Sequence, residues 1–251
     1  MKFSIITPSF NQADFIEETL KSVVSQKVDL EYLIQDGGST DGSIAIIKKY
    51  ADKYPKIISY VSHKDNGQVD AINQGIKRSK GDIIAYLNSD DYYLPESLSK
   101  VERYFQNHPD CLWLVGDCQV SDPKLSWTFA LKHLMPIQLF PKLLYLFNWI
   151  NQPSVFLRRD LVDKVGDFNS KYHYAFDYDY WLRCLKFARP YRLHKPLSVF
   201  RIQPNSKGNT SYQKQFAEDA IIIREYTHNH LALWLHRLGQ FITEKNYQKL
   251  K

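Results

Sequence analysis

The sequence predicts an α/β fold in which a mostly parallel central sheet is flanked by helices on both faces. Short apolar runs alternate three times with polar loops and amphipathic stretches, and a fourth apolar run follows at residues 82–87. This alternation is typical of parallel strands joined by crossover helices. It also places the loop after each strand at one common edge of the sheet.

The first unit begins with a short buried strand at residues 3–7 and a turn at residues 8–10. Asn11 is expected to cap the next helix, because an asparagine side chain can accept a hydrogen bond from a free N–H of the first turn. One helical face then carries the apolar residues Phe15, Ile16, Leu20, Val23 and Val24.

Two further units repeat this order. A strand at residues 32–35 leads into a loop at 36–42 that is rich in glycines and hydroxyl groups, and a strand at 57–61 leads into a loop at 63–67. Each loop precedes a helix with apolar residues three and four positions apart. These residues are Ile44, Ile47 and Tyr50 in one helix and Val69, Ile72 and Ile76 in the other.

The fourth strand ends on two adjacent carboxylates, Asp90 and Asp91. In an open α/β sheet this end faces the ligand crevice, so a carboxylate there is well placed to hold a divalent cation against a phosphate. Taken alone, the stretch is equally consistent with a polar turn that closes at Pro95. The three earlier units favour the site, and they predict that Asp36, Asp65, Asp90 and Asp91 converge.

Four motifs in this half resemble those of family 2 glycosyltransferases. They are Ser4–Asn11, Asp36–Ser43, Asp65–Asn73 and Leu87–Asp91 with Pro95, and they occur in the family's order. A fainter similarity continues to about Ser206. The resemblance implies a GT-A fold, a nucleotide-sugar donor, a divalent metal and inversion at the anomeric carbon.

The resemblance also implies how the chain is organised and which residues hold the donor. Residues 1–251 would form a single domain, with a Rossmann-like nucleotide-sugar-binding half at about 1–115, an acceptor-side half at about 116–210 and C-terminal helices at about 211–251. Asp36 would contact the base or ribose. The nucleotide-binding positions are Thr7, Pro8, Ser9, Asn11, Asp36, Gly38, Ser39, Asp65, Gly67, Asn73, Asn88 and Ser89.

Asp90 matches the family's metal ligand, but the chain departs from the family around it. Relatives often carry Asp-x-Asp where this chain has Asn88-Ser89-Asp90, and they commonly have a metal-binding histidine where this chain has Gln203. An amide adds no negative charge, so the nucleotide diphosphate would supply the remaining oxygens. Dependence on Mn²⁺ or Mg²⁺ is expected, with metal-weak catalysis as the alternative.

In the second half, Asp177 aligns with the catalytic base of the family, although Phe176 replaces the usual acidic neighbour. The following helix should bury Tyr178, Trp181, Leu182 and Leu185, and its dipole should keep Asp177 ionised. Asp177 could also be only a helix cap. Gln152, Asp91 and Asp179 are further candidates for contact with the acceptor.

Two apolar segments allow more than one interpretation. Residues 131–150 could form an acceptor-side lid, a membrane-surface segment or a buried core helix, but they are too interrupted to span a bilayer. The last helix could dock on the domain, or its basic face could touch an anionic bilayer. Its apolar residues are Leu231, Trp234, Leu235, Leu238 and Phe241, followed by Lys245, Lys249 and Lys251.

Composition limits the classes of partner. The 251 residues, 44% of them hydrophobic, can bury one substantial core, and Cys111, Cys118 and Cys184 are expected to be reduced thiols. A formal charge of +6 suits an anionic donor or a phospholipid surface. No nucleic-acid-binding motif accompanies this charge, so no nucleic acid partner is expected. The N-terminus carries no signal peptide, which predicts a cytoplasmic protein, peripheral at the inner membrane face if it touches a membrane.

The function that these observations favour is inverting transfer of a sugar, most simply from a UDP-sugar, to a hydroxyl of a glycan or lipid-linked acceptor. Bacterial surface polysaccharide synthesis is the expected setting, by analogy alone. Two alternatives stay open. One is a catalytically silent nucleotide-sugar-binding module, and the other is a nucleotidyltransferase.

Overall fold

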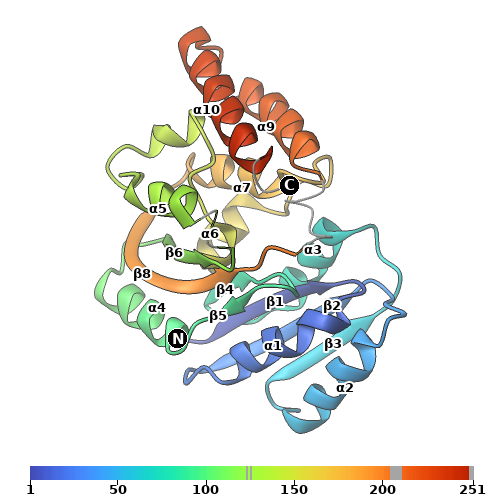
Figure 1. Ribbon diagram of the computed structural model, residues 1–251. Coiled ribbons are helices and arrows are strands. Elements are labelled where there is room, and N and C mark those ends of the chain that lie inside the picture. The colour runs from blue at the N-terminus through green and yellow to red at the C-terminus, as the bar shows by residue number, and fades with distance from the viewer. Residues whose placement is uncertain (123, 125, 204–210, 249–251) are drawn as a thin grey trace.

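The computed structural model describes residues 1–122, 124, 126–203 and 211–248 (Figure 1). Among these residues, eight strands form one sheet in the order β3-β2-β1-β4-β7-β6-β8-β5. The strands are β1 Phe3–Ser9, β2 Leu30–Asp36, β3 Ile58–Ser62, β4 Ile83–Tyr86, β5 Tyr92–Tyr93, β6 Trp113–Val120, β7 Val155–Arg158 and β8 Tyr191–Phe200.

Strands β3, β2, β1 and β4 all run parallel, which confirms the interpretation of the N-terminal alternation. The second half of the sheet is mixed. Strand β7 lies antiparallel to both β4 and β6, β6 is parallel to β8, and β5 is antiparallel to β8. Strand β4 therefore joins a parallel half to a mixed half.

Helices cover both faces of the sheet, as the sequence predicted (Figure 1). On β1, Phe3 and Ile5 pack with Leu20 in one core cluster, whereas Ile6 packs with Ile72 in the other. The helices are α1 Ala13–Val24, α2 Ser43–Lys53, α3 Gln68–Arg78, α4 Ser97–Asn107, α5 Ser126–Leu134, α6 Arg159–Val165, α7 Phe176–Cys184, α9 Tyr212–Tyr226 and α10 His230–Gln248, with 3₁₀ turns η2 Pro141–Tyr145 and η3 Gln152–Ser154.

The expectation for the start of α1 is wrong. Gln12, and not Asn11, occupies the N-cap position, and no side chain caps the helix. Asn11 has a positive φ of 51°, and its side-chain oxygen accepts a hydrogen bond from the N–H of Thr40. The asparagine thus joins two loops and does not begin a helix.

Residues 131–150 are neither a buried helix nor a wholly separate lid. Ile137, Leu144 and Ile150 are buried in the core, while Leu134, Leu139 and Phe140 are exposed. No helix among the described residues is both long and apolar enough to cross a membrane. The segment therefore contributes one side to the core and leaves the other uncovered.

Helix α10 docks on the molecule, but not through the face that the sequence suggested. Leu231, Trp234, Leu238 and Phe241 are all exposed. The buried side instead carries His236, and Gly239 of the same helix lies close to the ring of Phe147. The apolar residues do lie together on one face of α10, as their spacing predicted, but no other described residue covers that face.

Helix α3 approaches β1 so closely that only a glycine fits at position 75. A Cβ on Gly75 would clash with the side chain of Ile6, whereas a Cβ on Gly239 in α10 would meet nothing closer than 3.5 Å. Gly75→Ala should therefore lower the free energy of unfolding by about 1–3 kcal/mol, the usual cost of overpacking, despite the better helix propensity of alanine.

Urea denaturation of both variants tests this. Gly239→Ala is the matched control, and it should be neutral or stabilising because the same propensity gain meets no clash. Equal midpoints for the two variants would show that the contact between α3 and β1 is not as tight as described.

Candidate active site

The loops that follow β1 and β2 are joined by hydrogen bonds at the carboxyl edge of the sheet. The N–H of Asn11 donates to Ser39 Oγ (2.8 Å), and the N–H of Thr40 donates to Asn11 Oδ1 (2.9 Å). The N–H of Ala13 donates to Asp41 Oδ2 (2.9 Å). Asn11 and Ser39, both predicted nucleotide-binding residues, are therefore adjacent.

Asp36 shapes this edge from within the loop. Its Oδ2 accepts hydrogen bonds from the N–H groups of Gly38 and Ser39 and from Ser62 Oγ, each at 2.9 Å, and its Oδ1 accepts one from Ser39 Oγ at 2.5 Å. The side chain is buried. The resemblance implied that Asp36 contacts the base or ribose, and in the structure its carboxylate holds the loop in place through these hydrogen bonds.

The loop after β3 packs against the loop after β2, where Asp65 lies close to Gly37 and the backbone of Lys64 lies close to Gly38. A side chain at Gly37 would lie only 3.1 Å from the carboxylate oxygens of Asp65. Asp65 Oδ1 also accepts a hydrogen bond from the N–H of Gly67 (2.8 Å), and Gly38 and Gly67 both have positive φ. These left-handed conformations favour glycine, and they leave the backbone of the edge accessible to a ligand.

Three of the predicted nucleotide-binding side chains do not face the edge freely. Thr7 is fully buried, and its hydroxyl donates to the carbonyl of Leu87 (2.8 Å). Asn73 is also buried, and its amide pairs with both the N–H and the carbonyl of Phe168 (2.8 and 2.9 Å). Ser9 is buried with no hydrogen-bond partner for its hydroxyl in the described structure. We correct Thr7 and Asn73 to structural roles.

Asp90 and Gln203 lie side by side. Gln203 Nε2 donates to Asp90 Oδ2 (2.8 Å), which brings a residue after β8 against the end of β4. Asp91 is buried beside them, where its Oδ1 accepts a hydrogen bond from the N–H of Arg201 (2.9 Å). Burial and the negative charge of Asp90 raise the pKa of Asp91 well above its usual value. Asp91 is thus a structural residue and not an acceptor contact.

A chain of amide hydrogen bonds continues from this edge into the second half. Gln68 Nε2 donates to Asn88 Oδ1 (2.8 Å), and Asn88 Nδ2 donates to Gln152 Oε1 (3.3 Å). Gln152 Nε2 in turn donates to the carbonyl of Tyr86 (2.7 Å). The amide that replaces the family's first carboxylate therefore orients Gln152 of η3.

These residues open into a cavity of about 190 Å³ between the sheet edge and the C-terminal helices. Asp177 lies in its wall, at the start of α7. The residues that line it include Gln68, Asn88, Gln152, Lys132, Phe147 and Asp219. The cavity therefore joins the end of the nucleotide loops to the C-terminal helices.

Burial, and not the helix dipole, has the largest effect on the pKa of Asp177. Burial raises the pKa of Asp177 to about 6, although the N–H of Tyr178, which donates to Asp177 Oδ1 (2.8 Å), and the ammonium of Lys132 act in the opposite direction. The carboxylate is therefore ionised at neutral pH but close enough to its pKa to accept a proton readily.

Lys132 and Asp219 were not singled out from the sequence, yet both line the cavity with Asp177. Burial lowers the pKa of Lys132. Burial and the charge of Asp177 raise the pKa of Asp219 well above its usual value, and Asp219 Oδ1 has no hydrogen-bond partner in the described structure. The sequence did carry one indication for Asp219. It precedes the buried Ile222 and Ile223 by three and four positions, so helical spacing places it on the same buried face of α9.

Asp179 does not face the cavity. Its Oδ2 accepts a hydrogen bond from Arg183 Nε (2.9 Å), its Oδ1 accepts one from the hydroxyl of Tyr226 (2.7 Å), and it is only 2% exposed. The suggestion that Asp179 contacts an acceptor is wrong. The helical spacing that separates it from Asp177 by about 200° accounts for the difference.

The oxygen donors beside Asp90 fit a divalent cation only incompletely. No group of three or more His, Cys, Asp or Glu side chains suited to a metal occurs in the described part of the chain. Asp90 accepts a hydrogen bond from the Gln203 amide, and the adjacent carboxylate of Asp91 is buried and bonded to the N–H of Arg201. Mg²⁺ sites commonly use one or two carboxylates together with substrate phosphates, so these residues fit a metal whose coordination a bound diphosphate completes.

Comparison with known proteins gives a consistent result. The sequence model described as glycosyl transferase family 2 matches residues 4–189. A PGL/p-HBAD biosynthesis glycosyltransferase of Mycobacterium bovis (strain BCG / Pasteur 1173P2) is 28% identical over 219 residues, which cover 85% of this chain and 82% of that protein. A Haemophilus influenzae glycosyltransferase is 24% identical over 87% of this chain and 75% of its own length.

Solved structures with the same architecture include two with bound nucleotide-sugars. S. aureus TarS 1-349 in complex with UDP-GlcNAc superposes with a TM-score of 0.69 at 20% identity, over 89% of this chain and 65% of that one. The mannosyltransferase PcManGT of Pyrobaculum calidifontis, in complex with GDP-Man and Mn²⁺, superposes with a TM-score of 0.67 at 17% identity, over 94% of this chain and 73% of that one. The chain spans 39% of a longer TarS structure. At these identities the likeness shows the fold.

Removing the charge of Lys132 should raise the pKa of Asp177 above about 6, because the ammonium stabilises the carboxylate. We expect Lys132→Met to shift the Asp177 titration to higher pH and Lys132→Arg to leave it near the wild-type position. Carboxyl ¹³C NMR measures this, with the signal assigned by its loss in Asp177→Asn.

Lys142→Met is the matched control, since Lys142 is an exposed lysine in the neighbouring turn η2. It should leave the titration unchanged. An Asp177 pKa that is equal in Lys132→Met and Lys142→Met would exclude the charge interaction.

Proposed function

The chain belongs to glycosyl transferase family 2 and is a glycosyltransferase with the GT-A fold, and we propose that it transfers a sugar from a UDP-sugar to an acceptor hydroxyl with inversion at the anomeric carbon. The observation that supports this most strongly is the position of Asp177. Its carboxylate lies in the wall of a cavity that reaches Asn88 at the end of the nucleotide loops, and its pKa is about 6.

In the proposed mechanism Asp177 is the general base. It removes the proton from an acceptor hydroxyl in the cavity, and the oxygen attacks the anomeric carbon on the face opposite the diphosphate. Lys132 favours the ionised form of Asp177 before the proton is transferred. A positioned base typically contributes about 10²–10⁴-fold in rate.

The donor would lie along the carboxyl edge of β1, β2 and β4. The positive-φ glycines Gly38 and Gly67 carry no side chain, so a phosphate or a ring edge could approach the backbone closely at these two positions. Other residues at this edge that we assign to the nucleotide are Pro8, Ser9, Asn11, Ser39, Asp65, Asn88 and Ser89. A uridine donor is supported by TarS, which was solved with UDP-GlcNAc, although PcManGT was solved with GDP-Man.

Asp90 would hold Mn²⁺ or Mg²⁺ together with the donor diphosphate, with Gln203 beside it. Such a cation, when bound, neutralises charge that develops on the leaving diphosphate. The solved complex of PcManGT with GDP-Man and Mn²⁺ supports a cation in the family. This chain's own contribution is to place one carboxylate at the end of β4 and to restrain it through the Gln203 amide.

The acceptor that we propose is a glycan or a lipid-linked oligosaccharide in bacterial surface polysaccharide synthesis. The mycobacterial relative is named for PGL/p-HBAD biosynthesis, which supports a role in assembling surface molecules. The exposed apolar residues of 131–140 and α10 support contact with the inner membrane surface on its cytoplasmic side. Phe147 and Thr243 connect this region to the cavity wall.

Asp177→Asn should reduce turnover by at least about 10²-fold while UDP affinity and melting temperature stay near the wild-type values, because the amide keeps the shape but cannot accept the proton. Asp179→Asn is the comparison. It should lower thermal stability by weakening the buried pair with Arg183, with little loss of turnover per folded molecule.

Acceptor-dependent release of nucleoside diphosphate measures turnover, and it also separates a transferase from a silent binding module. Near wild-type turnover in Asp177→Asn would remove Asp177 as the base. Equal losses in the two variants would mean that the second half has been aligned in the wrong register.

Asp90→Asn should weaken Mn²⁺-dependent UDP binding at least about 10-fold, because the pocket loses its one half-exposed carboxylate beside Gln203. Gln203→His should maintain or strengthen the same binding by adding an imidazole ligand. Calorimetry of UDP binding with and without Mn²⁺ measures both. An affinity that is the same for wild type and Asp90→Asn under both conditions would favour metal-weak catalysis.

A further inference from the structure

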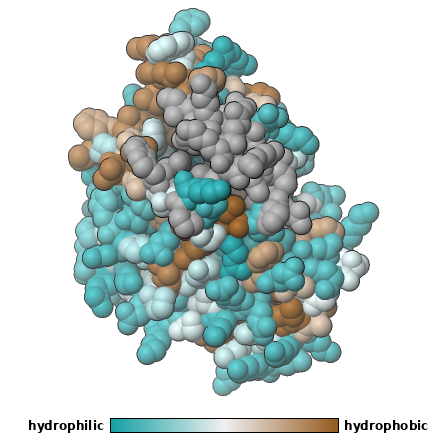
Figure 2. Space-filling view, in the orientation of Figure 1, coloured by the Kyte–Doolittle hydropathy of each residue, from teal (hydrophilic) through white to brown (hydrophobic). Residues whose placement is uncertain are grey.

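The exposed apolar surface of the chain is concentrated on two neighbouring segments. Eleven large hydrophobic residues are exposed in the part of the chain whose side chains the structure describes, and four of them lie within 131–140 and four on α10, so chance scatter does not account for them. Figure 2 shows hydrophobic residues gathered along the upper left of the molecule, over α10 and the segment after α5. The residues are Leu131, Leu134, Leu139, Phe140, Leu231, Trp234, Leu238 and Phe241, and we call them the apolar patch.

The two stretches of sequence that carry the apolar patch contain no acidic residue. No aspartate or glutamate occurs at residues 123–159 or 226–243, while both stretches contain basic residues. A surface that combines apolar side chains with basic ones and lacks acidic ones is complementary to the headgroup region of an anionic bilayer. A protein partner would need no such bias.

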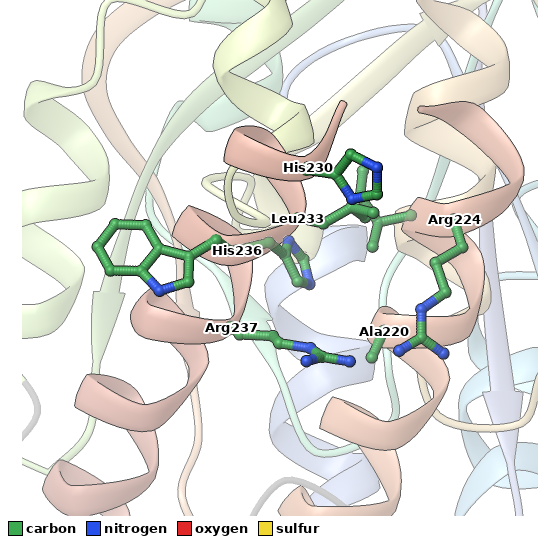
Figure 3. A pocket seen from close by; sticks show the side chains of 8 residues that line it. Ala220, Arg224, His230, Leu233, His236 and Arg237 are labelled. Atoms are coloured by element: carbon green, nitrogen blue, oxygen red, sulfur yellow. The ribbon is translucent and has the colours of Figure 1, made fainter. Parts of the chain in front are cut away.

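Beside the patch, α9 and α10 enclose a pocket of about 200 Å³ with a basic lining. Arg224 from α9 and Arg237 from α10 reach toward one another across it, with His230 at one end (Figure 3). Neither guanidinium forms an ion pair within the part of the chain that the structure describes. Two converging arginines can bind the oxygens of a phosphate in the bidentate manner that guanidinium geometry favours.

His236 adds a polar group at the inner wall of this pocket. It is 1% exposed, and neither of its ring nitrogens has a hydrogen-bond partner in the described structure. The backbone of Tyr145 and Leu146 is near enough to influence the ring, but not in hydrogen-bonding geometry. A buried polar side chain without a partner is uncommon in folded proteins, and a ligand oxygen in the pocket would supply the missing bond.

The pocket adjoins one edge of the apolar patch on α10, where Trp234 belongs to both. Successive helical residues differ by about 100°, so Leu231, Trp234, Leu238 and Phe241 fall within one arc of about 80°. His230 and Arg237 fall at its border by the same count. An apolar arc with an arginine at its border is typical of a helix that lies in a membrane interface.

We propose that the pocket between α9 and α10 binds the phosphate of an anionic phospholipid headgroup while the apolar patch enters the bilayer surface. This inference rests on the membrane contact in the proposed function and assigns the residues that make it. The cavity that holds Asp177 is partly lined by Thr243 of the same helix. Attachment through α10 would therefore present that cavity to an acceptor carried in the membrane.

The test compares binding of the whole chain to phosphatidylcholine vesicles with and without phosphatidylglycerol. Arg224→Gln combined with Arg237→Gln should weaken binding to the anionic vesicles at least about 10-fold, because each basic residue near such a surface contributes a factor of about five. The matched control is Lys48→Gln combined with Arg103→Gln, which removes the same charge from exposed positions on α2 and α4. Equal binding by the two double variants would overturn the proposal.

Vesicle binding and sedimentation together distinguish a lipid from two other occupants, a second copy of the chain and a free anion. Trp234→Ser combined with Phe241→Ser should weaken vesicle binding without changing net charge, while sedimentation shows the same oligomeric state as wild type. A change in oligomeric state with vesicle binding intact would assign the patch to a second copy of the chain. Arginine-dependent binding of inorganic phosphate without vesicle binding would assign the pocket to a free anion. Either result would overturn the proposal.

Stabilisation by UDP, measured as a shift in melting temperature, is recorded for every variant. Variants that keep the UDP shift and lose vesicles support a headgroup site apart from the donor site. If UDP stabilises neither the wild type nor the variants, the proposed donor is wrong. The vesicle comparison would still decide whether the pocket and the apolar patch bind anionic lipid.

Discussion

The position of β4 is the constraint on which the rest of the site depends. This strand pairs in parallel with β1 and antiparallel with β7, so the nucleotide loops and the acceptor-side segments meet at its carboxyl end. The amides of Gln68, Asn88 and Gln152 form a continuous hydrogen-bond chain across that meeting point. The last of these hydrogen bonds is made to the carbonyl of Tyr86, the final residue of β4. The nucleotide loops and the acceptor-side segments are therefore both held against the end of β4.

Burial sets the chemistry on the acceptor side. Removing a carboxylate from water favours its neutral form, and this effect is the largest contribution at Asp91, Asp177 and Asp219. A neighbouring carboxylate raises the pKa of the other two further, Asp90 at Asp91 and Asp177 at Asp219, whereas at Asp177 the N–H of Tyr178 and Lys132 oppose the effect of burial and its pKa is about 6. A carboxylate with a pKa near 6 suits the role of proton acceptor that we propose for Asp177.

The parallel half of the fold could be predicted from the sequence because apolar periodicity reports directly on strands and helices packed against a core. Sequence reasoning did less well at the site, where it kept Asp179 as a candidate for acceptor contact although residues two apart on α7 point to nearly opposite sides. It failed at Thr7 and Asn73, whose motif positions gave no sign that their polar atoms are satisfied by the backbone of distant residues. It missed Lys132 and Asp219 because long-range packing, and not local spacing, brings them to Asp177. The burial of α10 was assigned to the wrong face, since spacing alone cannot tell a docking face from an exposed one.

The central claim is that Asp177 supports a single displacement in this cavity. The most direct measurement is the anomeric configuration of the transferred sugar, read from the ¹H NMR coupling of the product formed with the UDP-sugar that most raises the melting temperature. An α-linked donor should give a β-linked product, because one attack opposite the leaving diphosphate inverts the centre. An α-linked product would require two displacements or a front-face reaction, and would contradict the account.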